Sequence, residues 1–429
     1  MTRVRPITTK KEATDIKIGG CSLIELANTY GTPLYVLDEA TIRNNCQVFT
    51  KTLTEHYPNF TIAYASKAGL NIGIANLIAS EDLGADVVSG GELYTVLQSK
   101  VDPKKIYFHG NNKSIDELEL AIKNNIRIVV DNPTELSLIK SIASQHSQQA
   151  YILFRIKPGI EAHTHEYIKT GHIDSKFGLT FSETLPLIQQ VIASDWGHFL
   201  GIHAHIGSQI FDMQPFYDLV SILVDYMATI KDEFNHDVLE LNCGGGFGIQ
   251  YKDSDNAPDI SDIILQMATE LKLLCDEKQL QHPKLIFEPG RSIIANAGVT
   301  LYSVGATKQV DGGSHYMFVD GGMADNPRPM MYQSEYTFDV LNPQSADRTT
   351  YKIAGKFCES GDILAEKVEL PTVKSNDFIV VYGTGAYNYS MASNYNRFCR
   401  PAMVLVNDQQ HSLIVKRETY SDLIRFDQS

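Results

Sequence analysis

The stretch Thr61-Ile-Ala-Tyr-Ala-Ser-Lys67 has the pattern of a short β-strand that ends on a lysine. Because the side chains of a strand alternate between two faces, Ala63 and Ala65 share a face with Lys67. The side chains on this face are small up to the lysine, so the strand leaves space for a bulky ligand and offers it the lysine amine as a nucleophile. A lysine that is removed from water and held near other cations can form a Schiff base with a carbonyl. The alternative interpretation is a lysine that extends from the strand end into solvent.

The same stretch is the first of eight strand-like runs, and helical patterns lie between most of them. Strands that alternate with helices over roughly 250 residues are typical of a parallel (β/α)8 barrel. We therefore predict an α/β fold in which residues 41–300 form this barrel. The eight runs are residues 61–66, 85–88, 105–109, 126–131, 151–157, 199–206, 238–243 and 284–288.

The pattern changes at about Leu301, where short strands follow one another without helices. These strands predict a mainly antiparallel β domain over residues 301–429. A single strand, Pro33-Leu-Tyr-Val-Leu-Asp38, precedes the barrel and is expected to join that domain. The N-terminal segment 1–40 is therefore predicted to contribute to the β domain, which would be discontinuous in sequence.

Composition limits the class of protein. The chain has 429 residues, of which 43% are hydrophobic and 21% charged, as in ordinary globular proteins. A formal net charge of −14 argues against a nucleic-acid partner and provides no basic surface for a membrane. No apolar run is long enough to span a bilayer, and the N-terminus lacks the apolar segment of a signal peptide. The six cysteines include no Cys-x-x-Cys pair. We expect a cytoplasmic protein.

The predicted barrel strands end on polar residues. In such barrels the working residues lie at the carboxyl ends of the strands, so this series indicates one functional site. No cluster has the spacing of a metal site, because the pair His163 and His165 lacks a nearby third ligand, and no metal is expected. The residues at or next to the strand ends are Lys67, Asp86, His109, Asp131, Arg155, His205, Gly244-Gly-Gly246 and Glu288.

Three of these positions together indicate a cofactor. Consecutive glycines at Gly244–Gly246 let backbone N–H groups converge on an anion such as phosphate. Ser208 and Arg291 can add a hydroxyl and a positive charge to the same anion. Glu288, on the last strand, can keep a pyridine nitrogen protonated, so that the ring accepts electron density from a carbanion. With the amine of Lys67, this set indicates pyridoxal 5'-phosphate.

The motifs resemble those of the fold-type III pyridoxal-phosphate decarboxylases, and specifically of the diaminopimelate branch of that family. The resemblance runs from about Pro33 to Leu423, which is nearly the whole chain. Five motifs are shared broadly with ornithine-type decarboxylases, whereas the Arg328 and Cys358 motifs are more particular to the diaminopimelate branch. The motifs are Tyr64-Ala-Ser-Lys67, Ser175-Lys-Phe-Gly178, His203-Ala-His-Ile-Gly-Ser-Gln209, Gly244-Gly-Gly246, Glu288-Pro-Gly-Arg291, Arg328-Pro-Met-Met-Tyr332, Cys358-Glu-Ser-Gly-Asp362 and Gly385-Ala-Tyr387.

The resemblance implies a role for each motif. Lys67 would hold the cofactor, Glu288 would meet its ring nitrogen, His205 would stack on its ring, and Cys358 would donate a proton. It also implies a head-to-tail homodimer in which the Cys358 loop completes the site of the partner. The implied cofactor-binding residues are Lys67, Asp86, His205, Ser208, Gly245, Gly246, Glu288, Gly290, Arg291 and Tyr387. The implied substrate-binding residues are Arg291, Arg328, Tyr332, Glu359 and Tyr387.

The implied reaction converts meso-2,6-diaminopimelate to L-lysine and CO2, the last step of lysine biosynthesis. The distal end of this substrate carries a carboxylate and an ammonium, which Arg328 and Glu359 could bind. The alternatives are a decarboxylase of ornithine, arginine or carboxynorspermidine, or a non-catalytic regulatory homologue. A racemase on the same barrel would be expected to place an arginine where Glu288 stands. One departure from the family pattern is Gly355-Lys-Phe357, where Gly-Pro-aliphatic is commoner before the cysteine.

Overall fold

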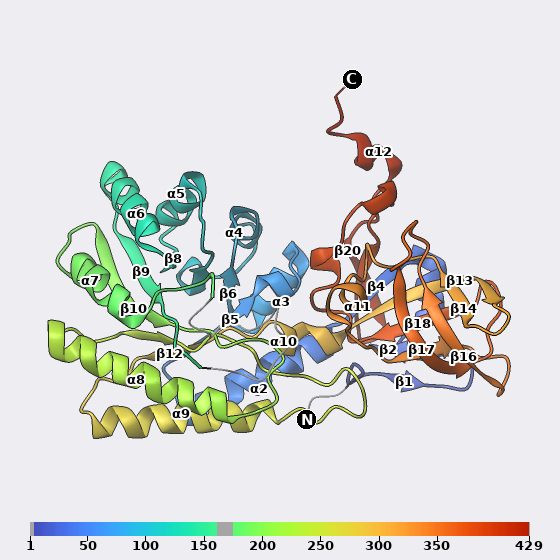
Figure 1. Ribbon diagram of the computed structural model, residues 1–429, viewed down its shortest axis with the longest axis horizontal. Coiled ribbons are helices and arrows are strands. Elements are labelled where there is room, and N and C mark those ends of the chain that lie inside the picture. Colours follow the sequence, from blue (N-terminus) through green and yellow to red (C-terminus); the bar gives the residue numbers. More distant parts are fainter. Residues whose placement is uncertain (1–3, 161–174, 429) are drawn as a thin grey trace. The chain divides into compact units, whose positions relative to one another are not determined.

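A computed structural model describes residues 4–160 and 175–428, so that the pair His163 and His165 lies outside the described residues (Figure 1). The chain divides into two compact units. The first contains residues 45–248 and 256–292, and the second contains residues 4–44, 249–255 and 293–428. In the part of the chain that the structure describes, no helix is long and apolar enough to cross a membrane.

The first unit is a closed barrel of eight parallel strands, as the alternating pattern predicted. Consecutive strands pair along the chain, and β12 pairs with β5 to close the ring. The carboxyl ends of all eight strands therefore meet at one end of the barrel. The strands are β5 (Phe60–Ala65), β6 (Gly84–Val87), β7 (Ile106–Phe108), β8 (Arg127–Val130), β9 (Ala150–Arg155), β10 (Gly197–His203), β11 (Glu240–Asn242) and β12 (Lys284–Phe287).

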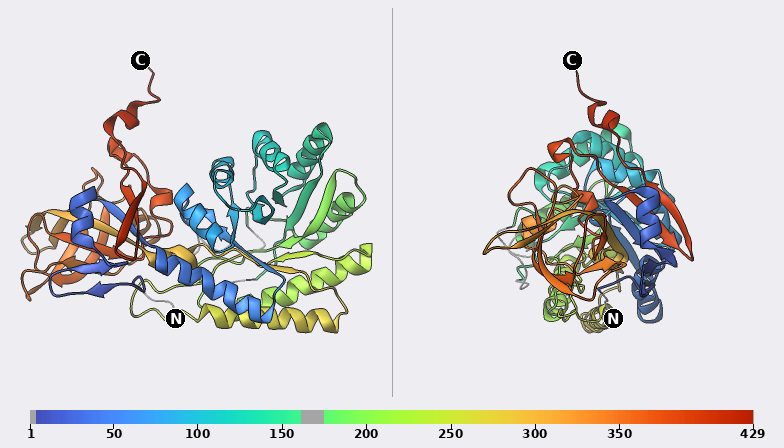
Figure 2. Two further views of the ribbon diagram at one scale, coloured as in Figure 1. Left: turned by 180° about the vertical axis from the view of Figure 1, so that it is seen from behind. Right: turned by 90° about the vertical axis from the view of Figure 1, so that its right-hand side faces the viewer.

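Capping residues fix where the barrel helices begin. Ser114 and Thr180 each form a capping box with the glutamate three residues later, and Asn71, Ser89 and Asn132 also accept a backbone N–H at a helix start. Two long helices, α8 and α9, lie side by side (Figure 2). The helices are α2 (Glu39–His56), α3 (Ile72–Ser80), α4 (Gly90–Leu97), α5 (Ile115–Lys123), α6 (Pro133–His146), α7 (Phe181–Ile192), α8 (Gln214–Phe234), α9 (Ile260–Glu277) and the short α10 (Arg291–Ile294).

The amino-terminal end of the barrel is closed by an ion network. Glu240, which starts β11, is buried and lies 2.8 Å from Arg127 at the start of β8 and 3.3 Å from Lys284 at the start of β12. The Tyr107 hydroxyl donates to the same carboxylate at 3.2 Å. Above this layer, apolar side chains fill the barrel, among them Ala63, Tyr107, Val129, Leu153, Leu200 and Ile286. The opposite end of the barrel is thus left for polar residues.

The second unit is built on a nine-stranded mixed sheet. Strand β4 (Leu34–Asp38) lies between β13 and β19, so the N-terminal strand joins the β domain as predicted. The β4–β19 and β14–β16 pairs are parallel, and the other pairs in this sheet are antiparallel. The other strands are β13 (Gly298–Gln309), β14 (His315–Val319), β15 (Phe338–Leu341), β16 (Arg348–Ala354), β17 (Ile363–Pro371), β18 (Phe378–Tyr382), β19 (Ala402–Asn407) and β20 (Gln410–Val415).

Two parts of this unit were not predicted. The first is a small sheet, β1 (Lys10–Lys11), β2 (Ile16–Ile18) and β3 (Cys21–Ser22), followed by helix α1 (Leu23–Tyr30). These elements are too short to show a period, but their apolar residues are buried in the core of the β domain. The second is β15, which pairs with β18. The expectation of strands without helices after Leu301 is also wrong in detail, because two short helices, α11 (Arg328–Tyr332) and α12 (Tyr420–Ile424), lie there; at five residues each they are too short to show a period.

Candidate functional site

The carboxyl end of the barrel gathers the polar residues that the strand ends predicted. Most of them are buried, which is unusual for charged side chains unless they are paired or functional. Asp86 is 1% exposed and Glu288 is 6% exposed. Buried with them are His109, Asp131, Arg155 and His203.

Lys67 follows β5 in a short 3-10 turn, and its side chain approaches a buried acid. The turn is held by the Tyr64 hydroxyl, which donates to the Gly69 carbonyl oxygen at 2.7 Å. Lys67 Nζ lies 3.3 Å from Asp86 Oδ2, while 42% of the lysine side chain remains exposed. The amine is therefore oriented toward the polar barrel end and is still accessible to a ligand.

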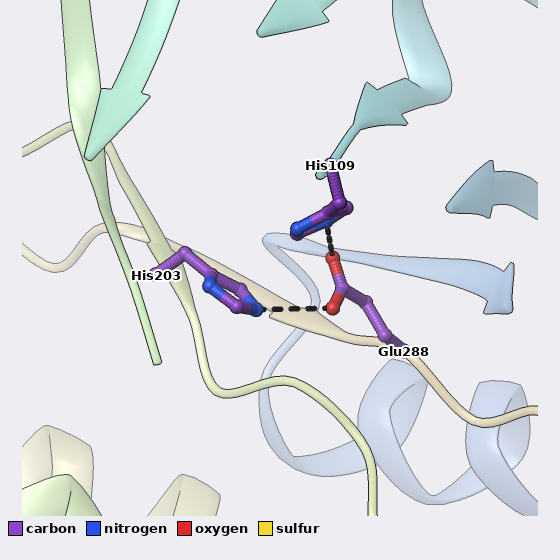
Figure 3. Close-up of side chains that lie close together, drawn as sticks. All are labelled: His109, His203 and Glu288. Carbon is purple, nitrogen blue, oxygen red and sulfur yellow. Dashed lines mark hydrogen bonds and ion pairs between the residues drawn. The ribbon is translucent and has the colours of Figure 1, made fainter. Parts of the chain in front are cut away.

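Glu288 lies at the centre of a buried hydrogen-bond network (Figure 3). Its Oε1 accepts from His109 Nε2 at 2.6 Å and from Asn242 Nδ2 at 2.6 Å. Its Oε2 accepts from His203 Nε2 at 3.1 Å. Each carboxylate oxygen has two lone pairs, so Oε1 is saturated while Oε2 can accept one further N–H.

This network keeps Glu288 ionised although it is buried. Burial would raise the pKa of Glu288, but attraction to His109 and the hydrogen bonds from His109 and His203 hold that pKa well below its usual range. Burial lowers the pKa of His203 to about 3, against the opposing attraction of Glu288. His203 is therefore neutral at physiological pH and donates through its Nε2–H. The result is a charged carboxylate with one oxygen open to a donor.

The pair of histidines and Glu288 also has the composition of a metal site. Their possible ligand atoms all lie within 4.8 Å of one another. However, the short hydrogen bonds from both histidines to Glu288 already use these atoms. The arrangement is thus explained as a hydrogen-bonded carboxylate, in which His203 is a buried histidine with a partner.

The glycine loop after β11 has no room for side chains. A Cβ on Gly244, which has φ of +65°, would lie 2.7 Å from the Ala204 carbonyl oxygen, and one on Gly245 would overlap the Glu288 carbonyl oxygen. Gly246 has φ of +104°, and its Cβ would lie 2.6 Å from the Gly207 carbonyl oxygen. Only glycine permits this close backbone approach, which is the requirement of an anion-binding loop.

Histidine and arginine side chains surround the same loop. The Gly245 N–H donates to His205 Nδ1 at 3.2 Å, so the Nδ1 of His205 is an acceptor. Burial, followed by the positive charges of Lys67 and Arg155, lowers the pKa of His205 well below its usual value, and the ring is neutral. Arg291 donates to the Ser208 hydroxyl at 3.0 Å, which joins the two residues predicted to help bind an anion. A Cβ on Gly290 would lie 2.9 Å from Ala65 Cβ, so this glycine allows β5 and β12 to approach.

The second unit carries the predicted arginine for a substrate carboxylate. Arg328 begins α11, and its guanidinium carbon lies 4.9 Å from the ring centre of Tyr332 and 5.6 Å from that of Tyr387. It also donates to the Ser334 hydroxyl at 3.4 Å. Two aromatic rings thus restrict the guanidinium, which is a preorganised fork for a carboxylate.

Cys358 lies in an exposed loop whose backbone is fixed on both sides. The Cys358 N–H donates to Asn396 Oδ1 at 2.8 Å, and the Phe357 N–H donates to Asp362 Oδ2 at 2.9 Å. Both Cys358 and Glu359 are exposed. The departure at Gly355-Lys-Phe357 is accommodated by Phe398, whose ring centre lies 5.0 Å from that of Phe357 and 4.5 Å from Lys356 Nζ. These contacts fix the loop without a proline.

The predicted residues fall into two groups, one in each unit. The structure adds Asn242, which the sequence analysis missed, and gives His109 and His203 a defined partner. The signal for Asn242 was a polar residue at the end of a barrel strand, two positions before the glycines. The first unit holds Lys67, Asp86, His205, Ser208, Gly245, Gly246, Glu288, Gly290 and Arg291, and the second holds Arg328, Tyr332, Cys358, Glu359 and Tyr387.

Comparisons with known proteins agree with this arrangement. Residues 39–295 match the family model described as "Pyridoxal-dependent decarboxylase, pyridoxal binding domain". A diaminopimelate decarboxylase of Synechocystis sp. is 47% identical over 96% of this chain and 90% of its own length. The diaminopimelate decarboxylase of Bacillus subtilis is 42% identical over 96% of this chain and 95% of its own length. A crystal structure of diaminopimelate decarboxylase from M. jannaschii in co-complex with L-lysine has a TM-score of 0.92 and 36% identity, and the match covers 99% of this chain and 98% of that one.

Proposed function

The chain belongs to the pyridoxal-dependent decarboxylases, in the branch of the diaminopimelate decarboxylases, and we propose that it converts meso-2,6-diaminopimelate to L-lysine and CO2. The observation that carries this proposal is the match over 99% of the chain to a diaminopimelate decarboxylase solved with L-lysine, which is the product of that reaction. The test is to supply the purified protein and cofactor with diaminopimelate, ornithine or arginine separately, and to measure CO2 and the amine product. Release of CO2 from ornithine or arginine in preference to diaminopimelate would contradict the proposal.

The residues of the barrel end fit pyridoxal 5'-phosphate. Three observations support the fit: the accessible amine of Lys67, the glycine loop without room for a Cβ, and the ionised Glu288 with one open lone pair on Oε2. When bound, the cofactor supplies an electron-accepting ring that stabilises the charge left on the substrate carbon after CO2 departs. We therefore propose that the protein is a decarboxylase that depends on pyridoxal 5'-phosphate.

Each barrel residue has a separate task. Lys67 supplies the amine that holds the cofactor covalently, and Asp86 keeps this amine oriented. Glu288 holds a ring proton at Oε2, because its low pKa leaves the carboxylate charged and able to stabilise a neighbouring cation. Ser208, Arg291 and the Gly246 N–H bind the phosphate, and Gly245, whose N–H donates to His205 Nδ1, lets the loop approach it closely. His205 contributes a flat neutral ring to the cofactor site, and Tyr387 contributes a phenol hydroxyl. Gly290 contributes by letting the strands approach closely.

The substrate is recognised by opposite charges. Diaminopimelate carries a carboxylate and an ammonium at the end that does not react. Arg328, held between Tyr332 and Tyr387, binds the distal carboxylate, and Glu359 binds the distal ammonium. Arg291 also contacts the substrate. A substrate without a distal carboxylate would leave Arg328 unpaired, which is the physical basis of discrimination against ornithine and arginine.

Arg328→Ala is expected to lower kcat/KM for diaminopimelate by a factor of roughly thirty to several thousand. Losing a charged partner for a buried carboxylate costs about 2–5 kcal/mol. Cofactor affinity should be unchanged, and the preference for diaminopimelate over ornithine should narrow. Steady-state kinetics with both substrates measures the effect.

The matched control is Arg348→Ala, which removes an exposed arginine of the same unit that pairs with Glu369. This variant should keep kcat/KM for diaminopimelate within a few fold of the value for the unchanged protein. If diaminopimelate kinetics are the same in Arg328→Ala as in the unchanged protein, the assignment of Arg328 to the distal carboxylate is wrong.

The active unit is a homodimer in which Cys358 and Glu359 act in the site of the partner. The exposed Cys358 loop, with its fixed backbone and unblocked side chains, supports this role. Cys358 donates the proton that replaces the departing CO2. No disulfide joins cysteines in the described residues, which fits a reducing compartment, and we place the protein in the cytoplasm.

Mixing inactive Lys67→Ala and inactive Cys358→Ala chains is expected to restore roughly a quarter of the activity of the unchanged protein. At random exchange half of the dimers are mixed, and one of the two sites in each mixed dimer contains both intact residues. The activity of the mixture after verified subunit exchange is the measurement.

A mixture of Lys67→Ala with Glu288→Gln is the control, because both changes fall in the same unit and no complete site can form. It should stay inactive. Absence of recovery in the first mixture would mean that each site is built within a single chain.

A further inference from the structure

Asn242 joins the two groups that hold opposite ends of the proposed cofactor. It is the last residue of β11 and is fully buried, at 0% exposure. Its Nδ2 donates to Glu288 Oε1 at 2.6 Å, and its Oδ1 accepts the Gly244 N–H at 2.9 Å. One amide therefore connects the acid for the ring nitrogen with the first residue of the phosphate loop.

The backbone around Asn242 is fixed independently of its side chain. Ala204 N–H donates to the Asn242 carbonyl oxygen at 3.0 Å, Cys243 N–H donates to the Ile286 carbonyl oxygen at 2.9 Å, and Glu288 N–H donates to the Gly244 carbonyl oxygen at 2.7 Å. The strand ends would thus stay in place if the amide were replaced. What the amide adds is control over the Glu288 carboxylate and the Gly244 N–H.

The residue type is restricted by this double task. An amide has both a donor and an acceptor, whereas a carboxylate has only acceptors and an aliphatic side chain has neither. Together with His109, the Asn242 amide saturates Glu288 Oε1. The only carboxylate oxygen left with capacity for a cofactor N–H is then Oε2, so that Asn242 determines which oxygen is offered.

We propose that Asn242 is a positioning residue that fixes the orientation and charge of Glu288 relative to the Gly244–Gly246 loop, and so sets the distance between the ring-nitrogen acid and the phosphate-binding backbone. The inference rests on the proposed function and deepens it at the same site. Asn242 acts through Glu288 and Gly244 and does not touch the reacting atoms. The charged or titratable groups that interact with Glu288 are His109, Arg155, His203, His205, Cys243 and Tyr107.

Asn242→Asp is the most informative change because it keeps the size of the side chain. The aspartate can still accept the Gly244 N–H, but it no longer donates to Glu288 and it places a second carboxylate beside it. Like charges at this distance raise the pKa of one member of the pair. The charge next to the ring nitrogen is then no longer the single fixed charge of Glu288, so the pH at which the bound cofactor changes protonation shifts.

The experiment compares the holoprotein with Asn242→Asp without substrate. We expect the pH-dependent transition of the visible absorbance of the bound cofactor to move by about one unit or more, since a like charge shifts a carboxyl pKa by that order. Cofactor affinity, measured by dialysis of the holoprotein, should fall about tenfold or more. Asn242→Ala, which adds no charge, should weaken cofactor binding with a smaller shift of the transition, and it carries the test alone if the aspartate variant does not fold.

A double-variant cycle with Glu288→Gln locates the effect. If Asn242 acts through Glu288, adding Asn242→Asp to Glu288→Gln should change both kcat and the proton concentration at the midpoint of the absorbance transition by less than about threefold. The reason is that the effects of coupled residues are not additive. The control is Asn132→Asp, the same exchange at the half-buried cap of α6, which should leave the absorbance transition unchanged.

The inference is overturned if Asn242→Asp and Asn242→Ala lower only the thermal stability and leave the absorbance transition and the cofactor affinity as they were. It is also overturned if the penalties of Asn242→Asp and Glu288→Gln simply multiply. Failure of the proposed function looks different, because then the unchanged protein would bind the cofactor without releasing CO2 from diaminopimelate, or would not bind it at all.

Discussion

Lys67→Ala is expected to bring turnover below detection and to remove the visible absorbance of the covalently held cofactor at the same time. The amine of Lys67 is the nucleophile that the site offers, and alanine cannot form the covalent attachment. The cofactor should still bind weakly, because the glycine loop and Glu288 remain. The absorbance spectrum and the CO2 assay on one sample measure both effects.

Lys67→Arg separates charge from chemistry. Arginine keeps a positive charge next to Asp86 but stays protonated and cannot attach the cofactor, so this variant should be as inactive as the alanine. Lys104→Ala, which removes an exposed lysine of the same unit, should behave as the unchanged protein. Borohydride reduction of the unchanged protein should fix the cofactor on the peptide that contains Lys67. A label on any other lysine would refute the assignment.

The barrel could be predicted from sequence because most of its helices are long enough to show their period and alternate regularly with the strand-like runs. The pattern over residues 72–80 and 115–123 predicted helices that the structure places at Ile72–Ser80 and Ile115–Lys123. The alternation of strands and helices also located the strand ends. Lys67, Asp86 and Glu288 could therefore be grouped from the sequence alone. The N-terminal sheet was missed for the opposite reason, since strands of two or three residues have no measurable period.

The parts of the site that sequence could not supply are the partners across the barrel. Glu288 and His109 are 179 positions apart in the chain, and only closure of the barrel brings them to 2.6 Å. Asn242 was hidden because an asparagine close to a run of glycines is also a common turn signal. Its function depends on the direction of its amide, which strand periodicity cannot give. The sandwich of Arg328 between two tyrosines likewise depends on the conformation of the loop that carries Tyr387, which has φ of +61°.

Glu288 is the residue at which burial and charge conflict most strongly. A carboxylate that is 6% exposed would normally take up a proton, yet His109, His203 and Asn242 hold it in the charged form. Glutamine is a strict test of that charge because it preserves the network. Its carbonyl oxygen can accept from His109 and Asn242, and its NH2 group can donate to His203 Nε2 when neutral His203 carries its proton on Nδ1, a buried atom with no partner among the described residues.

Glu288→Gln is therefore expected to fold and to keep the cofactor, while kcat falls by a factor of about 10²–10⁴. This is the range that a positioned proton-transfer group contributes. An amide cannot hold the ring proton, so the electron-accepting form of the ring is lost. Because the pKa of Glu288 in the folded protein is below that of free glutamate, about 4.3, its charge stabilises the fold above that pH, and this contribution disappears as the pH falls through the folded pKa. The difference in thermal unfolding midpoint between the unchanged protein and the glutamine variant should accordingly be largest near neutral pH and narrow in acid. Turnover within a few fold of the unchanged protein would show that the charge of Glu288 has no part in the reaction. A stability difference that grows in acid would show that this charge does not stabilise the fold.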